Sequence, residues 1–313
     1  MANINPQQQL SLIISIFPSQ ELLFTIVNHV HLAPFIINGS SLFYLAQKLM
    51  AVYTDQLGRK IELDYTPKRI ISLVPSQTEL LHNLGLEEEV IGITKFCVHP
   101  QQWFRHKMRI GGTKRLNIGK IKNLQPDLII ANKEENTREE IEELAMHFPV
   151  WISDVKNLKD AYSMILSIGD MVNKNKTSQK LVSDIQKNFF ALTPSAFKLK
   201  TCYLIWREPY ITVGGDTFIN DMLKQAGFQN IFANKIRYPE ITISQLLLTK
   251  CQLLLLSSEP YPFKQKHIAE LQNKLPNKKI ILADGEIFSW YGSRLVLAPA
   301  YFQKLRQQIK SID

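Results

Sequence analysis

The sequence has 313 residues, a length that favours two domains of ordinary size. Hydrophobic residues make up 45% of the chain and charged residues 21%, which is the ordinary composition of a soluble globular protein. The net charge of +9 comes from scattered lysines without an aromatic-studded basic stripe, so no nucleic-acid partner is expected.

Residues 1–49 hold apolar runs such as Leu10–Phe17 and no Lys or Arg before Lys48. A secretory signal needs a basic start, an apolar core and a small-residue cleavage site, and Pro18 interrupts the run here. No apolar run reaches the ~20 residues that a membrane span needs. We expect an extra segment outside the fold, with Met50 as the natural start. A degenerate signal and a loose membrane-associated arm are the alternatives.

Strands and helices alternate through residues 50–153. Ile70–Val74 is an apolar, β-branched run that predicts a buried strand, and Pro75-Ser76 ends it. Short joins between strands and helices indicate a parallel sheet with helices on both faces, which makes this region an N-terminal α/β lobe. Its expected elements are a hairpin at 53–63, strands at 70–74, 90–94, 127–131 and 149–153, and helices at 76–84, 117–124 and 138–147.

A long helix is expected next, from Asn157 to about Asn188, within a connecting segment of residues 154–192. Apolar residues recur at helical spacing on one face, and Asn157 suits the N-cap position. Some 30 residues at ~1.5 Å each span roughly 45 Å, enough for a rigid spine between two lobes. The alternatives are an ordinary long surface helix, or two helices broken near Lys174–Ser178.

The α/β pattern restarts after a join that contains Pro194, so residues 193–313 predict a C-terminal α/β lobe. Its expected strands are 202–206, 253–257 and 280–283, and its expected helices are 218–226, 243–249 and 295–311. The predicted fold class is therefore α/β, with two parallel-sheet lobes joined by one long helix and a ligand cleft between the lobes.

The loops at the carboxyl ends of the strands are where open α/β sheets bind ligands. Together they predict an aromatic lining with a few polar anchors, which suits a large planar or ring-rich ligand. Alternatively, Trp206 and Trp290 cap the core, and Arg294 anchors its own loop. The loop residues are Pro75, Ser76, Phe96, Cys97, His99, Trp206, Arg207, Glu208, Tyr210, Tyr261, Glu286, Phe288, Trp290, Tyr291 and Arg294.

Catalytic motifs are missing from these loops. The sequence has no Gly-x-Ser-x-Gly elbow and no phosphate-binding Gly-x-x-x-x-Gly-Lys loop, so no catalytic residue is assigned. Cys97 and His99 could ligate a metal together, because thiolate and imidazole are good ligands. The alternative is a free thiol and a loop histidine. The three cysteines stand at unrelated spacings and predict neither a disulfide framework nor a zinc cluster.

The segment Arg69–Leu80 resembles the opening of the helical-backbone substrate-binding proteins of ABC importers, and most of all the vitamin B12-binding branch. The resemblance extends to the C-terminus and includes residues 91–94, 124–129, 213–215, 230–232 and 288–291. It implies two Rossmann-like lobes on a single helix, no intrinsic cofactor, and a ligand that is a cobalt corrinoid or an iron chelate, either siderophore or haem.

Position by position, Phe96 matches a ligand-facing tyrosine of that branch and Tyr238 a ligand-facing tryptophan, whereas Thr113 replaces a second tryptophan. The expected ligand-binding set combines these matches with the loops: Pro75, Ser76, Phe96, Trp206, Arg207, Glu208, Tyr238, Trp290, Tyr291 and Arg294. The family docks onto its permease through one glutamate on each lobe. The matching positions here are Gly119 and about Ser244, with Glu240 as a neighbouring acid.

The function expected is a monomeric, non-enzymatic binding protein for a metal chelate that serves an ABC importer. The resemblance implies a periplasmic or cell-surface location. One alternative keeps the fold but places the protein in the cytoplasm as a corrinoid or haem handler. The other is an enzyme that acts on a bound cofactor, with Cys97 or Glu208 as the reactive group, and it requires a perturbed pKa at one of these residues.

Overall fold

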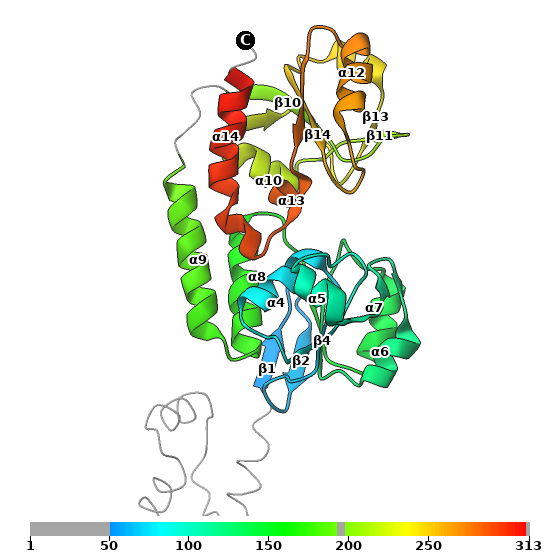
Figure 1. The fold of residues 1–313 in the computed structure, drawn as a ribbon, viewed down its shortest axis with the longest axis vertical. Helices are drawn as coiled ribbons and strands as arrows, with labels where there is room; N and C mark the ends of the chain where they lie inside the picture. Colours follow the sequence, from blue (N-terminus) through cyan, green and yellow to red (C-terminus); the bar gives the residue numbers. More distant parts are fainter. Residues whose placement is uncertain (1–50, 193–197, 311–313) are drawn as a thin grey trace, which may run out of the picture. The chain divides into compact units, whose positions relative to one another are not determined.

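The computed structural model describes residues 51–192 and 198–310 (Figure 1). By its internal contacts the chain divides into two units, Met1–Leu49 and Met50–Asp313. The expectations for residues 1–49 and for the join at Pro194 lie outside the described residues.

The N-terminal lobe is built on a five-stranded parallel sheet in the order β5-β4-β3-β8-β9. The central strand β3 and its neighbour β8 are buried along their whole length, which requires cover on both faces of the sheet. The strands are β3 Ile70–Ser72, β4 Val90–Ile93, β5 Met108–Arg109, β8 Leu128–Asn132 and β9 Val150–Ser153. The helices are α4 Pro75–Asn83, α5 Gln101–His106, α6 Ile118–Leu124 and α7 Arg138–Ala145. Two small antiparallel pairs complete the lobe, β1 Ala51–Thr54 with β2 Lys60–Leu63, and β6 Gly111–Gly112 with β7 Arg115–Leu116.

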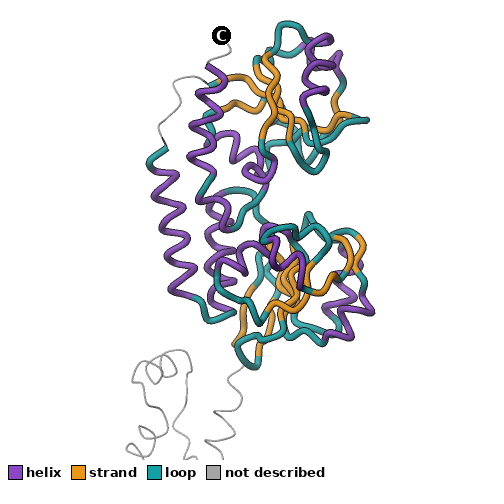
Figure 2. Tube along the Cα trace, viewed as in Figure 1, coloured by secondary structure: helices purple, strands orange, loops and turns teal. Residues whose placement is uncertain are grey.

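The C-terminal lobe repeats the plan with a four-stranded parallel sheet in the order β12-β10-β14-β15. Helices flank the strands of both sheets, as Figure 2 shows. The strands are β10 Leu199–Leu204, β12 Phe228–Asn230, β14 Leu253–Ser257 and β15 Lys279–Ala283, with an antiparallel pair of β11 Tyr210–Ile211 and β13 Glu240–Ile241. The helices are α10 Phe218–Gln225, α11 Ile243–Leu248, α12 Gln265–Lys274, α13 Gly285–Ser289, the 3-10 turn η1 Ser293–Val296 and α14 Ala298–Lys310. The predicted α/β class with parallel sheets is confirmed.

The prediction of one long helix from Asn157 to about Asn188 is wrong. Two helices replace it, α8 Leu158–Met171 and α9 Asn175–Phe190, and they run side by side in opposite directions (Figure 1). The chain turns at Asn173, which takes a left-handed φ of 54° that Asn tolerates better than most residues. Gly169 makes room for the turn, because a Cβ there would lie 2.1 Å from the hydroxyl oxygen of Ser178. The alternative of a break near Lys174–Ser178 is therefore the correct one.

Both helices contact the C-terminal lobe. The backbone N–H of Leu158, at the start of α8, donates to the carboxylate of Asp221 on α10 at 3.0 Å. An acid at this position suits the positive end of the helix dipole. Near the end of α9, the amide of Asn188 donates to the carbonyl of Val296 at 3.0 Å. The helical pair thus ties together residues that are far apart in the sequence.

One apolar core extends through both lobes. It includes Ile71 of the first sheet, Ile165 and Ile185 of the helical pair, and Leu255 of the second sheet. A second cluster covers the other face of the C-terminal sheet and includes Leu254. Alternate residues of β14 enter different clusters because successive strand side chains point to opposite faces. The shared core favours a fixed arrangement of the lobes within residues 50–313.

Candidate functional site

Two predicted ring residues are exposed, one in each lobe. Phe96 follows β4 and is 51% exposed, with the Nζ of Lys95 5.1 Å from its ring centroid. Trp206 follows β10 and is 40% exposed, in edge contact with Tyr261 at 5.8 Å between centroids. Large exposed rings at strand ends retain apolar surface that a flat ligand can cover. They are the members of the predicted set best placed to stack on a ligand.

The rings of Trp290 and Tyr291 are buried, with exposures of 6% and 7%. The indole N–H of Trp290 donates to Glu259 at 2.9 Å, and its ring lies 5.6 Å from that of His99 in the other lobe. Tyr291 packs edge-on against Phe218 at 5.7 Å. Both rings therefore belong to the packed contact between the lobes, and the core-capping alternative fits Trp290 better than an open stacking wall.

Arg294 is also engaged within the protein. Its Nε and Nη2 donate to the two carboxylate oxygens of Glu79 on α4, at 3.0 and 2.7 Å. Its Nη1 lies 2.6 Å from Glu286, and its guanidinium lies 4.6 Å from the centroid of the Trp290 ring. This side chain joins the lobes rather than standing free for a ligand. The alternative that Arg294 is an anchor is the one its contacts support.

Ser76 lies in the same contact. Its carbonyl faces Gly292, where an added Cβ would approach the carbonyl oxygen to 2.6 Å. The Ser76 side chain is buried, while Pro75 opens α4 at a position where the missing N–H costs nothing. The hydroxyl of Tyr291 is buried, and burial, followed by the charge of Glu135, raises its pKa against the lowering effect of the Ser76 side chain.

A second bridge between the lobes is made by Glu134, in the loop after β8. Its carboxylate accepts hydrogen bonds from Arg237 and from the hydroxyl of Tyr238, both in the loop before β13. Burial and the nearby charge of Glu134 raise the pKa of Tyr238, so the phenol stays protonated. Tyr238 therefore meets the opposite lobe at the position that the resemblance assigns to a ligand-facing ring.

Arg207 and Glu208 form a local ion pair after β10. The Nη2 of Arg207 lies 3.2 Å from Glu208 and 2.9 Å from Glu270 on α12. Glu208 has a positive φ of 63°, an uncommon backbone conformation for this residue type. Its side chain is 79% exposed, so the Glu208 carboxylate is accessible beside Trp206.

Cys97 and His99 have different surroundings. The Cys97 thiol is fully buried and lies 3.1 Å from the hydroxyls of Thr78 and Thr94. Burial raises the pKa of the Cys97 thiol, which disfavours the thiolate that a metal would need. His99 instead faces Glu286, at 3.3 Å. Within residues 51–192 and 198–310, no group of three or more His, Cys, Asp or Glu side chains is arranged to hold a metal ion.

Glutamates that the sequence did not single out shape this region. Glu79, Glu134 and Glu259 each accept hydrogen bonds from a predicted site residue. Burial, and then the charge of Glu286, raises the pKa of Glu259 against the lowering effect of its hydrogen bond from Ser289. Glu134 lies in the polar loop that follows β8. Glu79 lies within the Arg69–Leu80 segment, and Glu259 lies in the loop that follows β14.

The two positions matched to docking acids lie on the surface. Gly119 is exposed on α6 and Ser244 is exposed on α11, with Glu240 exposed nearby in β13. Among the helices that the structure describes, none combines the length and the apolar character needed to cross a membrane.

Comparison with known proteins assigns the family. Residues 70–281 match the periplasmic binding protein family. The vitamin B12-binding protein of Vibrio parahaemolyticus is 26% identical over 195 residues, which are 61% of this chain and 70% of that protein.

Solved structures agree in fold. The periplasmic vitamin B12-binding protein of Vibrio cholerae is 22% identical, covers 78% of this chain and 99% of its own, and superposes with a TM-score of 0.63. The periplasmic haem-binding protein of Roseiflexus sp. RS-1 is 18% identical, covers 76% and 98%, and has a TM-score of 0.66. The chain is a member of the periplasmic binding protein family.

Proposed function

We propose that this protein binds a metal chelate, either a cobalamin-like corrinoid or an iron chelate such as haem or a ferric siderophore. The observation that carries the proposal is the pair of exposed rings, Phe96 and Trp206, at strand ends of the two lobes. An aromatic face recognises the apolar surface of a macrocycle or an aromatic chelator and not a bare ion. The metal therefore arrives already chelated, and the relatives named above bind vitamin B12 and haem.

The surroundings of the two rings support binding without a large conformational change. The lobes share one apolar core and are bridged by Arg294 with Glu79 and by Glu134 with Tyr238. A preformed binding region loses less conformational freedom when the ligand arrives. The accessible carboxylate of Glu208 and the amine of Lys95 stand beside the rings and can meet the polar edge of a chelate.

The protein acts in this proposal as a monomeric carrier that delivers its ligand to an ABC permease, on the periplasmic or cell-surface side of the membrane. Membership of the family supports this role. The enzyme alternative needs a reactive group, and Cys97 is ill suited because it is fully buried with a raised thiol pKa. The proposal therefore assigns binding and no turnover.

Calorimetric titration with cyanocobalamin, cobinamide, haem and a ferric siderophore tests the proposal. We expect one of the four to bind with a 1:1 stoichiometry and a Kd below about 10 μM, a level worth roughly 7 kcal/mol. Failure of all four to reach this affinity contradicts the proposal. Chemical conversion of the bound chelate during the titration would favour the enzyme alternative instead.

A further inference from the structure

The C-terminal lobe exposes a group of aliphatic side chains that the proposed ligand site does not use. Ile236 is 75% exposed, Leu247 55% and Leu248 89%. Single exposed aliphatic residues are common on protein surfaces, but Leu247 and Leu248 are adjacent in the chain. Leu248 ends α11 and lines a pocket of about 390 Å³ together with Lys235, the neighbour of Ile236 in the chain. The loop after β12 and the end of α11 therefore present one apolar surface.

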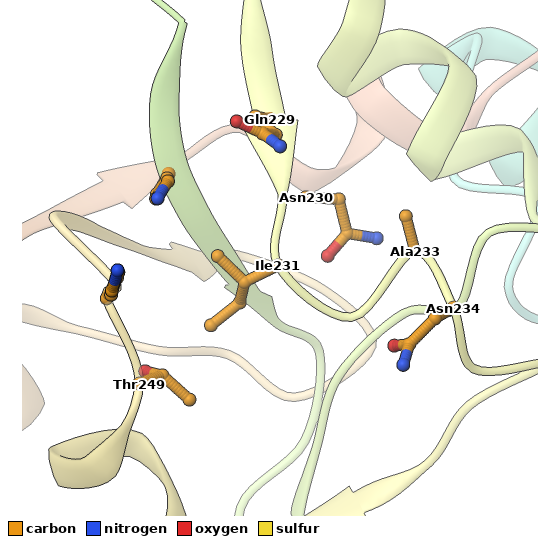
Figure 3. Close-up of a pocket in the computed structure, with 8 residues that line it drawn as sticks. Gln229, Asn230, Ile231, Ala233, Asn234 and Thr249 are labelled. Carbon is orange, nitrogen blue, oxygen red and sulfur yellow. The ribbon is translucent and has the colours of Figure 1, made fainter.

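Lysines border this apolar surface. Lys200 and Lys250 line a second pocket of about 470 Å³, together with the side chains of Gln229, Asn234 and Thr249 (Figure 3). Thr249 lines both pockets, so they are neighbours. We define the basic–apolar face as Lys200, Lys235, Ile236, Leu247, Leu248 and Lys250.

The charges on this face are unbalanced. Across the ranges that the structure describes, no ion pair to an acidic side chain is found for Lys200, Lys235 or Lys250. Glu240 is the one acid among the described residues that line either pocket. Amide and hydroxyl groups in the second pocket add hydrogen-bond donors beside the two amines.

We propose that the basic–apolar face binds the surface of a membrane that contains anionic phospholipids. Protruding leucine and isoleucine side chains can enter the boundary between headgroups and acyl chains, while the three amines approach the phosphates. Lysine suits this role because a flexible point charge needs no fixed partner geometry. The net charge of +9 adds long-range attraction to an anionic surface.

The membrane is favoured over a protein partner because of the shape and chemistry of this face. Leu248 is 89% exposed, so most of its side chain is open to solvent although it borders a pocket. The cationic groups are lysines rather than the arginines and aromatic residues that are enriched in protein interfaces. The inference does not depend on the chelate, because the face contains neither Phe96 nor Trp206 and the test contains no chelate.

Vesicle co-sedimentation of the full chain tests the inference. The probes are vesicles of phosphatidylcholine alone and vesicles that also contain phosphatidylglycerol. We expect binding only to the anionic vesicles, and weakening as salt is raised. Lys235→Gln with Lys250→Gln should lower the partition coefficient about 25-fold, or about fivefold for each lysine. Leu248→Asp should lower it at least about tenfold.

Matched variants on other surfaces serve as controls. The double variant Lys176→Gln, Lys187→Gln removes the same charge from exposed positions of α9 and matches the Lys235, Lys250 double variant. Met146→Asp places an acid at the end of α7 and matches Leu248→Asp at the end of α11. Both controls should keep at least half of the wild-type partition coefficient. Circular dichroism before sedimentation excludes unfolded variants.

Three outcomes contradict the inference. The first is equal binding to neutral and anionic vesicles. The second is equal loss in the face variants and in their controls, which would place membrane binding elsewhere in the chain. The third is no binding to the anionic vesicles; if the protein then sediments with native membranes, used as an additional probe, a protein partner is indicated. None of these outcomes bears on chelate binding, so the inference and the proposed function fail independently.

Discussion

Arg294 and Glu79 form a bidentate pair of hydrogen bonds between the lobes, with N···O distances of 3.0 and 2.7 Å. The two residues are 215 positions apart in the sequence. A guanidinium that meets both oxygens of a carboxylate gives the strongest class of protein hydrogen bond. Because Glu286 and the Trp290 ring also contact Arg294, the residue organises the whole contact between α4, α13 and η1.

Arg294→Ala should therefore lower the free energy of unfolding by about 2–4 kcal/mol, because Glu79 and Glu286 lose their shared cation. Arg294→Lys keeps the charge but not the bidentate geometry, so its free energy of unfolding should fall between those of the wild type and the alanine variant. Urea unfolding gives the values. Arg138→Ala, which breaks an exposed pair with Glu142, is the control and should cause no measurable loss. Equal losses at 294 and 138 would mean that the bridge does not stabilise the fold.

Gly292→Ala should destabilise the protein by about 1–3 kcal/mol, because the new Cβ must push Ser76 away. The Cβ would lie 2.6 Å from the Ser76 carbonyl oxygen and 3.3 Å from the Cβ of Leu80. Gly119→Ala is the matched control, since its Cβ meets only Asn117 at 3.7 Å within α6. It should be neutral or stabilising by up to about 1 kcal/mol. A Gly292→Ala protein as stable as Gly119→Ala would show that the lobes are not in close contact there.

Trp290→Ala should act on stability, with a loss of about 3–5 kcal/mol, because it removes a buried ring and leaves Glu259 without its indole donor. Trp206→Ala should cost less than about 1 kcal/mol, since 40% of that side chain is exposed. Thermal and urea unfolding measure both. If Trp290→Ala left stability unchanged and abolished chelate binding, Trp290 would be a ligand-stacking residue after all.

Glu259→Gln tests the buried carboxyl through the pH dependence of stability. Burial raises the folded-state pKa of Glu259, so in the native state this group holds its proton to higher pH than in the unfolded state. The native state then binds more protons, and the contribution of Glu259 to stability falls as pH rises from about 4.3, the unfolded value, through the raised folded value. Glutamine cannot ionise, so the Glu259→Gln variant does not lose this contribution to stability as pH rises.

The free energy of unfolding of Glu259→Gln minus that of the wild type should therefore increase as pH rises from about 4.3 to the raised folded-state pKa of Glu259. Unfolding titrations at several pH values give the difference curve. Glu135 and Asp221 have raised pKa values as well, but they are present in both proteins and so cancel to a first approximation. A pH-independent difference would contradict the assigned shift.

The sequence predicted most strands of the two parallel sheets, because they are short apolar runs between clear breaks, but it missed the short edge strands β5 and β12. Leu253–Ser257 is one example, and both its boundaries were correct. The N-cap at Asn157 was also predicted correctly, as its side chain accepts from the N–H of Asp160 at 3.0 Å. Helix α12 was missed because its packing depends on few buried positions, His267 and Leu271.

The break between α8 and α9 was not resolved from the sequence because the turn contains neither Gly nor Pro. The left-handed conformation of Asn173 is a permissive choice for that residue rather than a required one. The pairing of Arg294 with Glu79 was beyond local reasoning altogether, since it depends on how two lobes meet. For the same reason Trp290 and Tyr291 were expected to line the ligand and are found buried, whereas Phe96 and Trp206 keep the exposure that the prediction needs.

The most direct test of the central claim is calorimetric titration of the tightest-binding chelate into the Phe96→Ala, Trp206→Ala double variant. Phe190→Ala is the control, because Phe190 is 94% exposed on α9 and has no predicted ligand role. We predict that the double variant loses about 2–5 kcal/mol of binding free energy, the sum of two stacking contacts, while the control binds as the wild type does. Wild-type affinity in the double variant would contradict the claim that these two rings hold the ligand.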